Sequence, residues 1–304
     1  MAGRDPLPRV VSDAAPAFEA VTDLRATRRR RRVGDVAWGD MAYRVYTASF
    51  AGLVMVVFLA GLIGDRPLGG PTVDEVARRA PAWAGVLLAV AALAGVRSGR
   101  RGGPLSMEAA DVHHLLSAPI ARRTVLRRPL LSLLGYGLAG GAVVGAIAGG
   151  LAAQRLPGAD AAWLACGALF GAMVMASATG AALVAGSRAL PPLVPVAVAV
   201  ALLAWAVLDV AGVVTGAPTS HAASVVRWPL RFDVWPLLAV VVLAAVVVWG
   251  AWHIGGLSIE AARRRTDLVG QIRFAVTQQD LRSVVLLRRQ LADERPRATP
   301  ILRL

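Results

Sequence analysis

Four residues that could bind a metal ion lie close together in one polar segment. Glu108, Asp111, His113 and His114 fall within seven residues of one another. Carboxylates and imidazoles are ordinary metal ligands, and on a helix Glu108, Asp111 and His114 would share one broad face. However, only this segment offers ligands, whereas a metalloenzyme embedded in a membrane generally takes them from several spans. A metal-dependent enzyme is therefore the weaker interpretation of the segment.

Composition excludes several other kinds of chemistry. All 33 basic residues are arginine. A P-loop requires a lysine, so the chain cannot carry that type of ATP-hydrolysing site, and a Schiff-base mechanism is excluded too. Cys166 is the only cysteine, which rules out an intrachain disulfide or a cysteine-rich zinc site. The sequence therefore predicts no enzyme activity, no cofactor and no bound metal in this chain.

The polar segment belongs to an arginine-flanked insert, residues 97–128, that is predicted to contain a short helix over 106–117. Ser106 can cap its first amides, and the two carboxylates lie near the positive end of its dipole. Its apolar stripe consists of Val112, Leu115 and Leu116. Ser117 and Pro119 are typical of the start of a second short helix, and Pro129 is predicted to open the following apolar run. A short helix with apolar knobs suits docking into a groove on another protein.

The elements around this insert are those of a polytopic membrane protein. The chain is 56% hydrophobic, has a mean hydropathy of +0.58 and still carries a net charge of +14, with its charges grouped between apolar blocks. A helix of about 20 apolar residues crosses the hydrocarbon core. Six runs are candidates: Val45–Gly64, Ala82–Val96, Leu130–Ala153, Ala161–Gly186, Pro192–Val214 and Pro236–Ile254. The second is short and is predicted to include Pro81 and the residues around Arg97 as well. The predicted fold class is all-α, with six transmembrane helices.

Arginine counts predict the orientation of these spans. With six spans, 27 arginines fall on the side that carries both termini and the insert, and six fall on the other. The positive-inside rule then predicts cytoplasmic N- and C-termini, a cytoplasmic insert and a location in the inner (plasma) membrane. The domains expected are a tail at 1–44, a six-span domain at 45–254 and a basic cytoplasmic tail at 255–304.

Both tails are predicted to carry amphipathic basic helices. The first, Phe18–Arg32, suits the anionic inner leaflet, so membrane lipids are expected partners and nucleic acid is not. The second covers Ile272–Arg297. Within it, the sequences AVT at 275–277 and DLR at 280–282 repeat the sequence AVTDLR of Ala20–Arg25 with two residues inserted. The repeat arises either by chance or because the tail is the beginning of a second half that is similar to the first.

Glycines in the third span predict tight packing. Gly137, Gly141, Gly145 and Gly149 recur every four residues and form one groove, and Gly167 and Gly171 repeat the spacing once. In lipid, such grooves let helix backbones approach closely.

The loop at 215–235 is predicted to lie on the outer side. Its tryptophans and prolines favour short helices that return into the outer leaflet. Asp209, near the outer end of the fifth span, is interpreted as an interfacial or cavity-facing residue in preference to a proton relay.

This layout resembles the permease subunit of a type-2 ABC exporter. The motif ADVHHLLSAPI at 110–120, followed by Arg122, Arg123 and Leu126, is similar to that family's coupling region. The tail motifs QDLR at 279–282 and LLRRQL at 286–291 resemble actinobacterial members. The layout covers most of the chain, whereas the motifs cover about forty residues. No family function matches His113 and His114.

The resemblance implies a transporter subunit that pairs with an ABC ATPase subunit and a second permease half, as a homodimer or a heterodimer. The 106–117 helix would then be the coupling helix, sitting in a cleft of the ATPase, and ATP and Mg²⁺ would bind to that partner. Eight residues would make the coupling contact: Glu108, Asp111, Val112, His113, His114, Leu115, Leu116 and Pro119.

Two alternatives remain open, a non-transporting scaffold or receptor subunit and, less favoured, the membrane-embedded metalloenzyme. The sequence does not name the transported substrate. The low charge inside the spans favours an apolar or amphipathic cargo, such as a lipid, a peptide or a drug.

Overall fold

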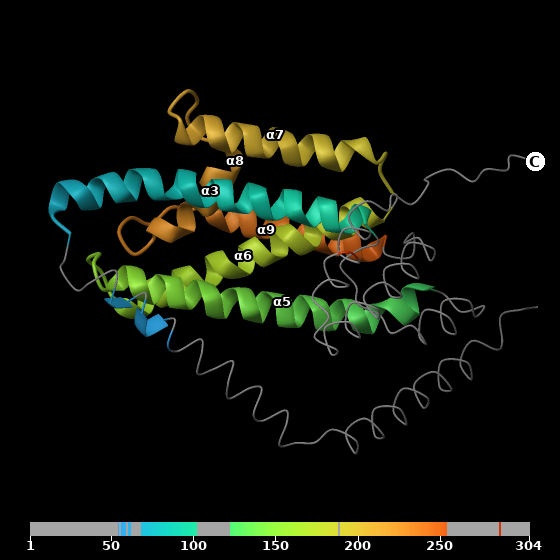
Figure 1. Cartoon of the computed structure of the whole chain (residues 1–304), viewed down its shortest axis with the longest axis horizontal. Coiled ribbons are helices and arrows are strands. Elements are labelled where there is room, and N and C mark those ends of the chain that lie inside the picture. Colours follow the sequence, from blue (N-terminus) through green and yellow to red (C-terminus); the bar gives the residue numbers. More distant parts are fainter. Residues whose placement is uncertain are drawn as a thin grey trace, which may run out of the picture. The chain divides into compact units, whose positions relative to one another are not determined.

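The computed structural model describes residues 68–101, 122–187 and 189–253, with residue 286 and six residues between 54 and 61. The chain divides into two units, Met1–Leu62 and Ile63–Leu304, and the helices below belong to the second. Within the described residues every regular element is a helix, as the all-α class predicts. The helices are α3 (Gly70–Arg100), α5 (Arg122–Ala153), α6 (Asp160–Gly186), α7 (Leu193–Val210), α8 (Pro218–Ala223), the 3₁₀ helix η1 (Ser224–Arg227) and α9 (Trp235–Trp252) (Figure 1).

Five of these helices are long and apolar enough to cross a membrane: α3, α5, α6, α7 and α9. Each coincides with an apolar run in which the sequence predicted a span, so the chain is a multi-pass membrane protein. The other predicted span, Val45–Gly64, lies outside the described residues except for a few positions between 54 and 61. The predicted domain boundaries at 44 and 254, and both tails, fall outside them as well.

The predicted second span was too short, because α3 begins well before Ala82–Val96. The residues before it, assigned from the sequence to a loop, form the first turns of this helix. Pro71 lies in the first turn, where its missing N–H leaves no hydrogen bond unmade. Glu75 pairs with Arg79 one turn later. Pro81 lies inside α3 and is buried, so packing holds the helix together across it.

The predicted start of the third span was also wrong. Pro129 does not open this span, because α5 already begins at Arg122 and continues through the proline. Leu126 and Leu130 on either side are only 2% and 5% exposed, so this turn is fixed by packing. The hydroxyl of Ser132 donates a hydrogen bond to the carbonyl oxygen of Pro129, at 2.9 Å. A proline is tolerated in a membrane helix when neighbouring groups support the backbone in this way.

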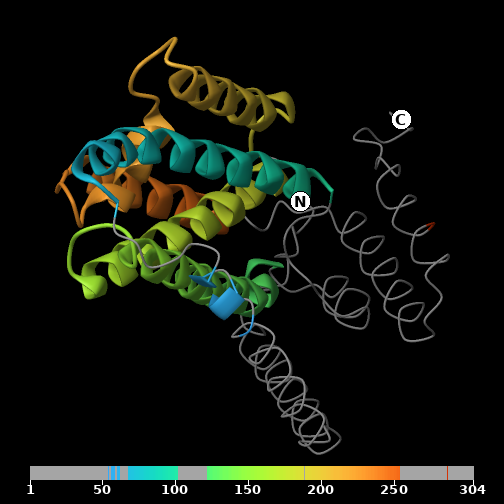
Figure 2. The ribbon, with the colours of Figure 1, turned by 60° about the vertical axis from the view of Figure 1, so that its left-hand side comes forward.

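The helix α6 lies at the centre of the bundle. It packs extensively against α3, α5 and α9, while α7 packs mainly against α3. Figures 1 and 2 show α5 and α7 on opposite sides of the bundle, with α3 and α6 between them. The helix ends form two groups. We call the end with Arg100, Arg122 and Trp252 the arginine end, and the opposite end, with α8 and η1, the α8 end.

The four glycines of the predicted groove lie on the face of α5 that meets α6. At three of them a side chain would collide with a backbone carbonyl of α6. The pairs are Gly141 with Gly171, Gly145 with Gly167, and Gly149 with Trp163. The fourth, Gly137, has more room, because the nearest atom to an added Cβ is the methyl group of Met175 at 3.6 Å. The backbones of α5 and α6 therefore touch along about two helical turns.

Further along α6, toward its C-terminal end, the contact with α3 is equally close. Added Cβ atoms at Gly95 and Gly99 would collide with the carbonyl oxygens of Ala178 and Ala182. On the same interface, the hydroxyl of Ser177 donates a hydrogen bond to the carbonyl oxygen of Leu88, at 3.2 Å. Small residues at two levels along α6 thus set the spacing of the three central helices.

A pair of substitutions in α5 tests this packing. Gly145→Leu should lower the free energy of unfolding by about 2 kcal/mol or more, because the new side chain would meet the backbone of α6. Gly140→Leu is the matched control on the same helix, since an added Cβ there meets open space, and it should change stability little. Thermal unfolding of the purified protein in detergent measures both. Equal midpoints for the two variants would contradict the α5–α6 contact.

Candidate functional site

The insert that sequence analysis singled out lies outside the described residues, which stop at Arg101 and resume at Arg122. This applies to every side chain assigned there to coupling: Glu108, Asp111, Val112, His113, His114, Leu115, Leu116 and Pro119. Its two flanking helices are described, and they show how the insert is anchored.

The α3 flank of the insert is fixed to α6 close to where it leaves the bundle, and the α5 flank is buried in part. On α3, Gly99 lies directly against the backbone of α6 at Ala182. The helix then ends with the N–H of Arg101 donating to the carbonyl oxygen of Ser98, at 3.1 Å. On α5, the buried Leu126 lies in the second turn. The insert therefore connects two helices that are packed against the same third helix.

The carboxylates of the described residues lie at one end of the bundle, whereas arginines occur at both ends. The last turn of α3 and the first two turns of α5, with the cap residue of α3, supply seven arginines to the arginine end: Arg97, Arg100, Arg101, Arg122, Arg123, Arg127 and Arg128. All carboxylates of the described residues lie toward the α8 end: Asp74, Glu75, Asp160, Asp209 and Asp233. The described part of the arginine end is thus strongly positive.

At the α8 end, the segment 218–227 folds back into the bundle as α8 and η1. These are short helices, as the sequence predicted for this loop. Ala223 and Val225 are fully buried, in a cluster with Leu88 of α3 and Met173 of α6. α8 lies so close to α3 that a Cβ at Gly85 would come within 2.7 Å of the Ser220 nitrogen. This segment closes the space between α3, α6 and α9.

Asp209 ties the end of α7 to the start of α8. Its two carboxylate oxygens accept hydrogen bonds from the backbone N–H groups of Gly216 and Ala217, at 3.1 and 3.3 Å. Gly216 and Gly212 have φ angles of +82° and +74°, a conformation that favours glycine, so the chain can turn sharply here. Asp209 therefore holds a loop in place.

Asp233 ties η1 to the start of α9. Its Oδ2 accepts hydrogen bonds from Nη2 of Arg227 at 2.8 Å and from the hydroxyl of Ser224 at 3.3 Å. Its Oδ1 accepts the backbone N–H of Trp235 at 3.3 Å. Partial burial alone would raise the pKa of Asp233, but these hydrogen bonds and the charge of Arg227 outweigh it and lower the pKa. The ionised form is thus the one that the fold stabilises.

Four buried polar atoms in residues 219–228 have no hydrogen-bond partner in the described part of the protein: Thr219 Oγ1, Ser220 Oγ, Arg227 Nε and Trp228 Nε1. An unpaired buried polar atom costs about 1–3 kcal/mol. All four belong to residues 219–228, so they form the main concentration of unused hydrogen-bonding capacity among the described side chains. A polar group that reached this segment could bind there.

Other chemistry-bearing residues are isolated in the described helices. No group of three or more His, Cys, Asp and Glu residues that could hold a metal occurs among the described residues. Cys166 is a buried free thiol in α6.

Most of the sequence matches a known protein family. Residues 74–300 match a family described as a family of unknown function, DUF6297. This chain belongs to the DUF6297 family. The matched region contains the insert and nearly all of the described helices. No curated protein and no solved structure matches the chain.

Sequence reasoning missed two features of this DUF6297 chain. Gly95 and Gly99, one helical turn apart on α3, carry the same packing signal as the α5 glycines, but a single repeat stands out little in a glycine-rich chain. Asp233 was not singled out. Its position after both Arg227 and Arg231 was the only available signal, and nothing in that spacing shows which arginine it pairs with.

The first prediction from this region concerns Asp209. Asp209→Ala should lower the free energy of unfolding by about 1–3 kcal/mol, because two backbone N–H groups lose their acceptors. Asp209→Asn, which keeps one oxygen, should lose less. Limited proteolysis of the loop at 211–217 and thermal unfolding measure the effect, with Asp74→Ala, an exposed carboxylate, as the control. If Asp209→Ala and Asp74→Ala behaved alike, the anchor would have no energetic role.

The second prediction concerns pH. Because the pKa of Asp233 is lower in the folded protein, its stabilisation is present above the unfolded-state pKa of about 4. It is lost as the pH falls from there through the folded-state pKa. Asp233→Asn should lower the unfolding midpoint at pH 7 and reduce its decline in acid. Thermal unfolding over a pH series tests this, and parallel curves for the variant and the original protein would refute it.

Proposed function

We propose that this DUF6297 chain is the membrane-spanning permease subunit of an ATP-driven exporter, with ATP hydrolysis on a separate ATPase subunit. One observation carries the proposal: the helices before and after the insert are both packed against α6, with α3 in backbone contact near its end. Because these helices are closely packed, a force applied to the insert would move α3, α5 and α6 together. Coupling to an ATPase requires such a joint movement.

The charge distribution supports the orientation in the proposal. Of the twelve described arginines, seven lie at the arginine end and five lie at the α8 end together with all described carboxylates. We therefore propose that the arginine end faces the cytoplasm, that both termini lie there, and that the membrane is the inner (plasma) membrane. The insert would then be on the side where ATP is available.

Within this proposal, the insert carries the contact with the ATPase. Val112, Leu115 and Leu116 enter a cleft of that partner, and Glu108 or Asp111 meets basic residues at the rim. ATP and Mg²⁺ bind to the ATPase, consistent with the absence of lysine from this chain. A second permease half, identical or different, completes a substrate path for an apolar or amphipathic cargo.

Two other functions make different predictions. A non-transporting scaffold or receptor subunit would use the same anchored insert to hold a partner without any coupling to ATP hydrolysis. A membrane-embedded metalloenzyme would bind a metal through Glu108, Asp111 and His114, so metal analysis of the purified chain distinguishes it.

The function is tested by a double substitution in the insert. Leu115→Asp with Leu116→Asp should weaken association with the cognate ATPase at least about tenfold. Apolar anchors in a docking site commonly contribute about 2 kcal/mol each. The double substitution should also uncouple ATP hydrolysis in reconstituted vesicles, while the unfolding midpoint of the spans stays unchanged. A pull-down with the ATPase and a hydrolysis assay provide the two measurements.

The tail offers a matched control for this test. Leu286→Asp with Leu287→Asp changes another pair of adjacent leucines, also followed by arginines, and should leave ATPase binding intact. Unaltered binding and hydrolysis in the insert variant would remove the insert from the mechanism. Binding that weakened equally in both variants would show a general effect of added charge. Normal ATPase binding without coupled hydrolysis in the original protein would favour the scaffold.

A further inference from the structure

Four exposed arginines lie at the arginine end, two on α3 and two on α5, and we call them the basic collar: Arg97, Arg100, Arg127 and Arg128. The first two lie in the last turn of α3, where a positive charge also complements the helix dipole. The other two follow the buried Leu126 at the start of α5. Because both helices pack on α6, the four charges are held at one end of a single bundle.

Nothing in the described part of the protein neutralises the collar. At the α8 end, by contrast, Glu75 pairs with Arg78 and Arg79, and Asp233 pairs with Arg227. No carboxylate of the described residues lies at the arginine end. The collar is therefore a set of exposed like charges on a packed scaffold, and it is open to negative charge from outside the described residues.

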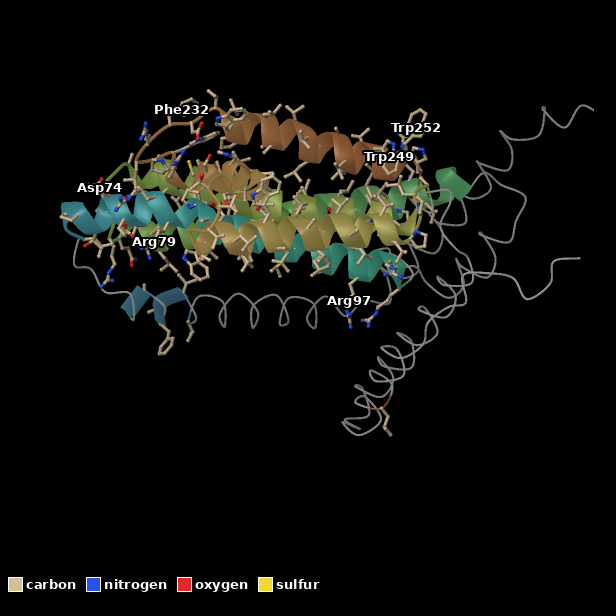
Figure 3. All side chains as sticks on the ribbon, turned by 90° about the horizontal axis from the view of Figure 1, so that it is seen from above. Asp74, Arg79, Arg97, Phe232, Trp249 and Trp252 are labelled. Carbon is tan, nitrogen blue, oxygen red and sulfur yellow. The ribbon has the colours of Figure 1, made fainter. Side chains whose placement is uncertain are left out.

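Aromatic residues indicate at which depth of the membrane the collar lies. Trp252 is 62% exposed in the last turn of α9, and Trp249 lies against His253 with ring centroids 4.5 Å apart. Figure 3 shows Arg97, Trp249 and Trp252 toward one end of the bundle, and Asp74, Arg79 and Phe232 toward the other. Exposed tryptophans at the ends of membrane helices lie where hydrocarbon meets headgroups.

The length of α9 agrees with a position of its terminal tryptophans at the two boundaries of the hydrocarbon core. Its 18 residues rise about 27 Å, close to the roughly 30 Å thickness of the hydrocarbon core. With Trp235 at one boundary and Trp252 at the other, the arginine end of the bundle reaches the headgroup layer of one leaflet. The collar is thus at the depth of lipid phosphates.

We propose that the basic collar binds the phosphate groups of anionic phospholipids in the leaflet at the arginine end. The guanidinium group is planar and matches two oxygens of a phosphate, and it stays charged at any physiological pH. Four such groups on packed helices select lipids with a net negative charge over zwitterionic ones. The binding is independent of the exporter function proposed above, because it requires only the described bundle in a bilayer.

The experiment uses the full chain in nanodiscs made from equal amounts of phosphatidylglycerol and phosphatidylcholine. Native mass spectrometry after release from the disc gives the ratio of the two lipids that remain bound, and the anionic lipid should predominate. Arg97→Gln with Arg100→Gln should reduce this ratio about fivefold or more, because one arginine near an anionic surface contributes about 1 kcal/mol. Arg127→Gln with Arg128→Gln should act in the same direction.

Two controls make the result decisive. Arg78→Gln with Arg79→Gln removes two arginines from the other end of the same helix and should leave the ratio unchanged. Arg97→Lys with Arg100→Lys keeps the charge and should keep most of the enrichment, which also reports whether loss in the glutamine variant reflects misfolding. An unchanged ratio in both collar variants would overturn the proposal. The proposal would also be overturned if inorganic phosphate fully stabilised the protein against thermal unfolding in discs of phosphatidylcholine alone. In that case the site would bind a free ion.

Discussion

Close approach of helix backbones around α6 is the interaction on which the rest of the bundle depends. In lipid there is little hydrophobic force between helices, so association relies on dispersion contacts at short range. α6 offers Gly167 and Gly171 to α5, and Ala178 and Ala182 to α3. Helices that meet at these residues cannot shift sideways without separating, because no flexible side chains lie between the backbones. The positions of α3 and α5, and therefore of the insert between them, follow from α6.

The two ends of the bundle are built on different principles. The α8 end satisfies much of its own polarity, with Asp209 holding the start of α8 and Asp233 holding the start of α9. The described part of the arginine end has no such carboxylate, and the four arginines of its basic collar are exposed. One end is thus organised by contacts within the protein, whereas the other is organised for contacts with other molecules. Both the ATPase and the anionic lipids that we propose as partners belong to the second end.

Much of this architecture could be predicted because hydrophobic length is a property of the sequence alone. The apolar runs that became α6, α7 and α9 were recognisable without any knowledge of their neighbours. The starts of α3 and α5 were not, because Pro81 and Pro129 lie inside helices that packing keeps continuous. Local rules on proline describe a helix in isolation, and these two helices are not isolated.

The candidate site was less predictable than the fold. The α5 glycines could be found because they repeat four times on one face, and the structure puts that face against α6. The pairing of Arg227 with Asp233 depends on how the turn at 228–232 folds, which spacing does not reveal. The contact of Gly85 with Ser220 joins residues far apart in the sequence, so only the tertiary structure could show it.

The central place of α6 also constrains the order in which the protein can be assembled during synthesis. α3 leaves the ribosome before α6, so its face at Gly95 and Gly99 has no partner until α6 has entered the membrane. By contrast, α5 and α6 are joined only by residues 154–159 and can pair as a hairpin as soon as both are inserted. α3 then docks on the free face of that hairpin, and only afterwards is there a surface on which α8 and η1 can pack. An insertion factor that holds early membrane helices would therefore act chiefly on α3.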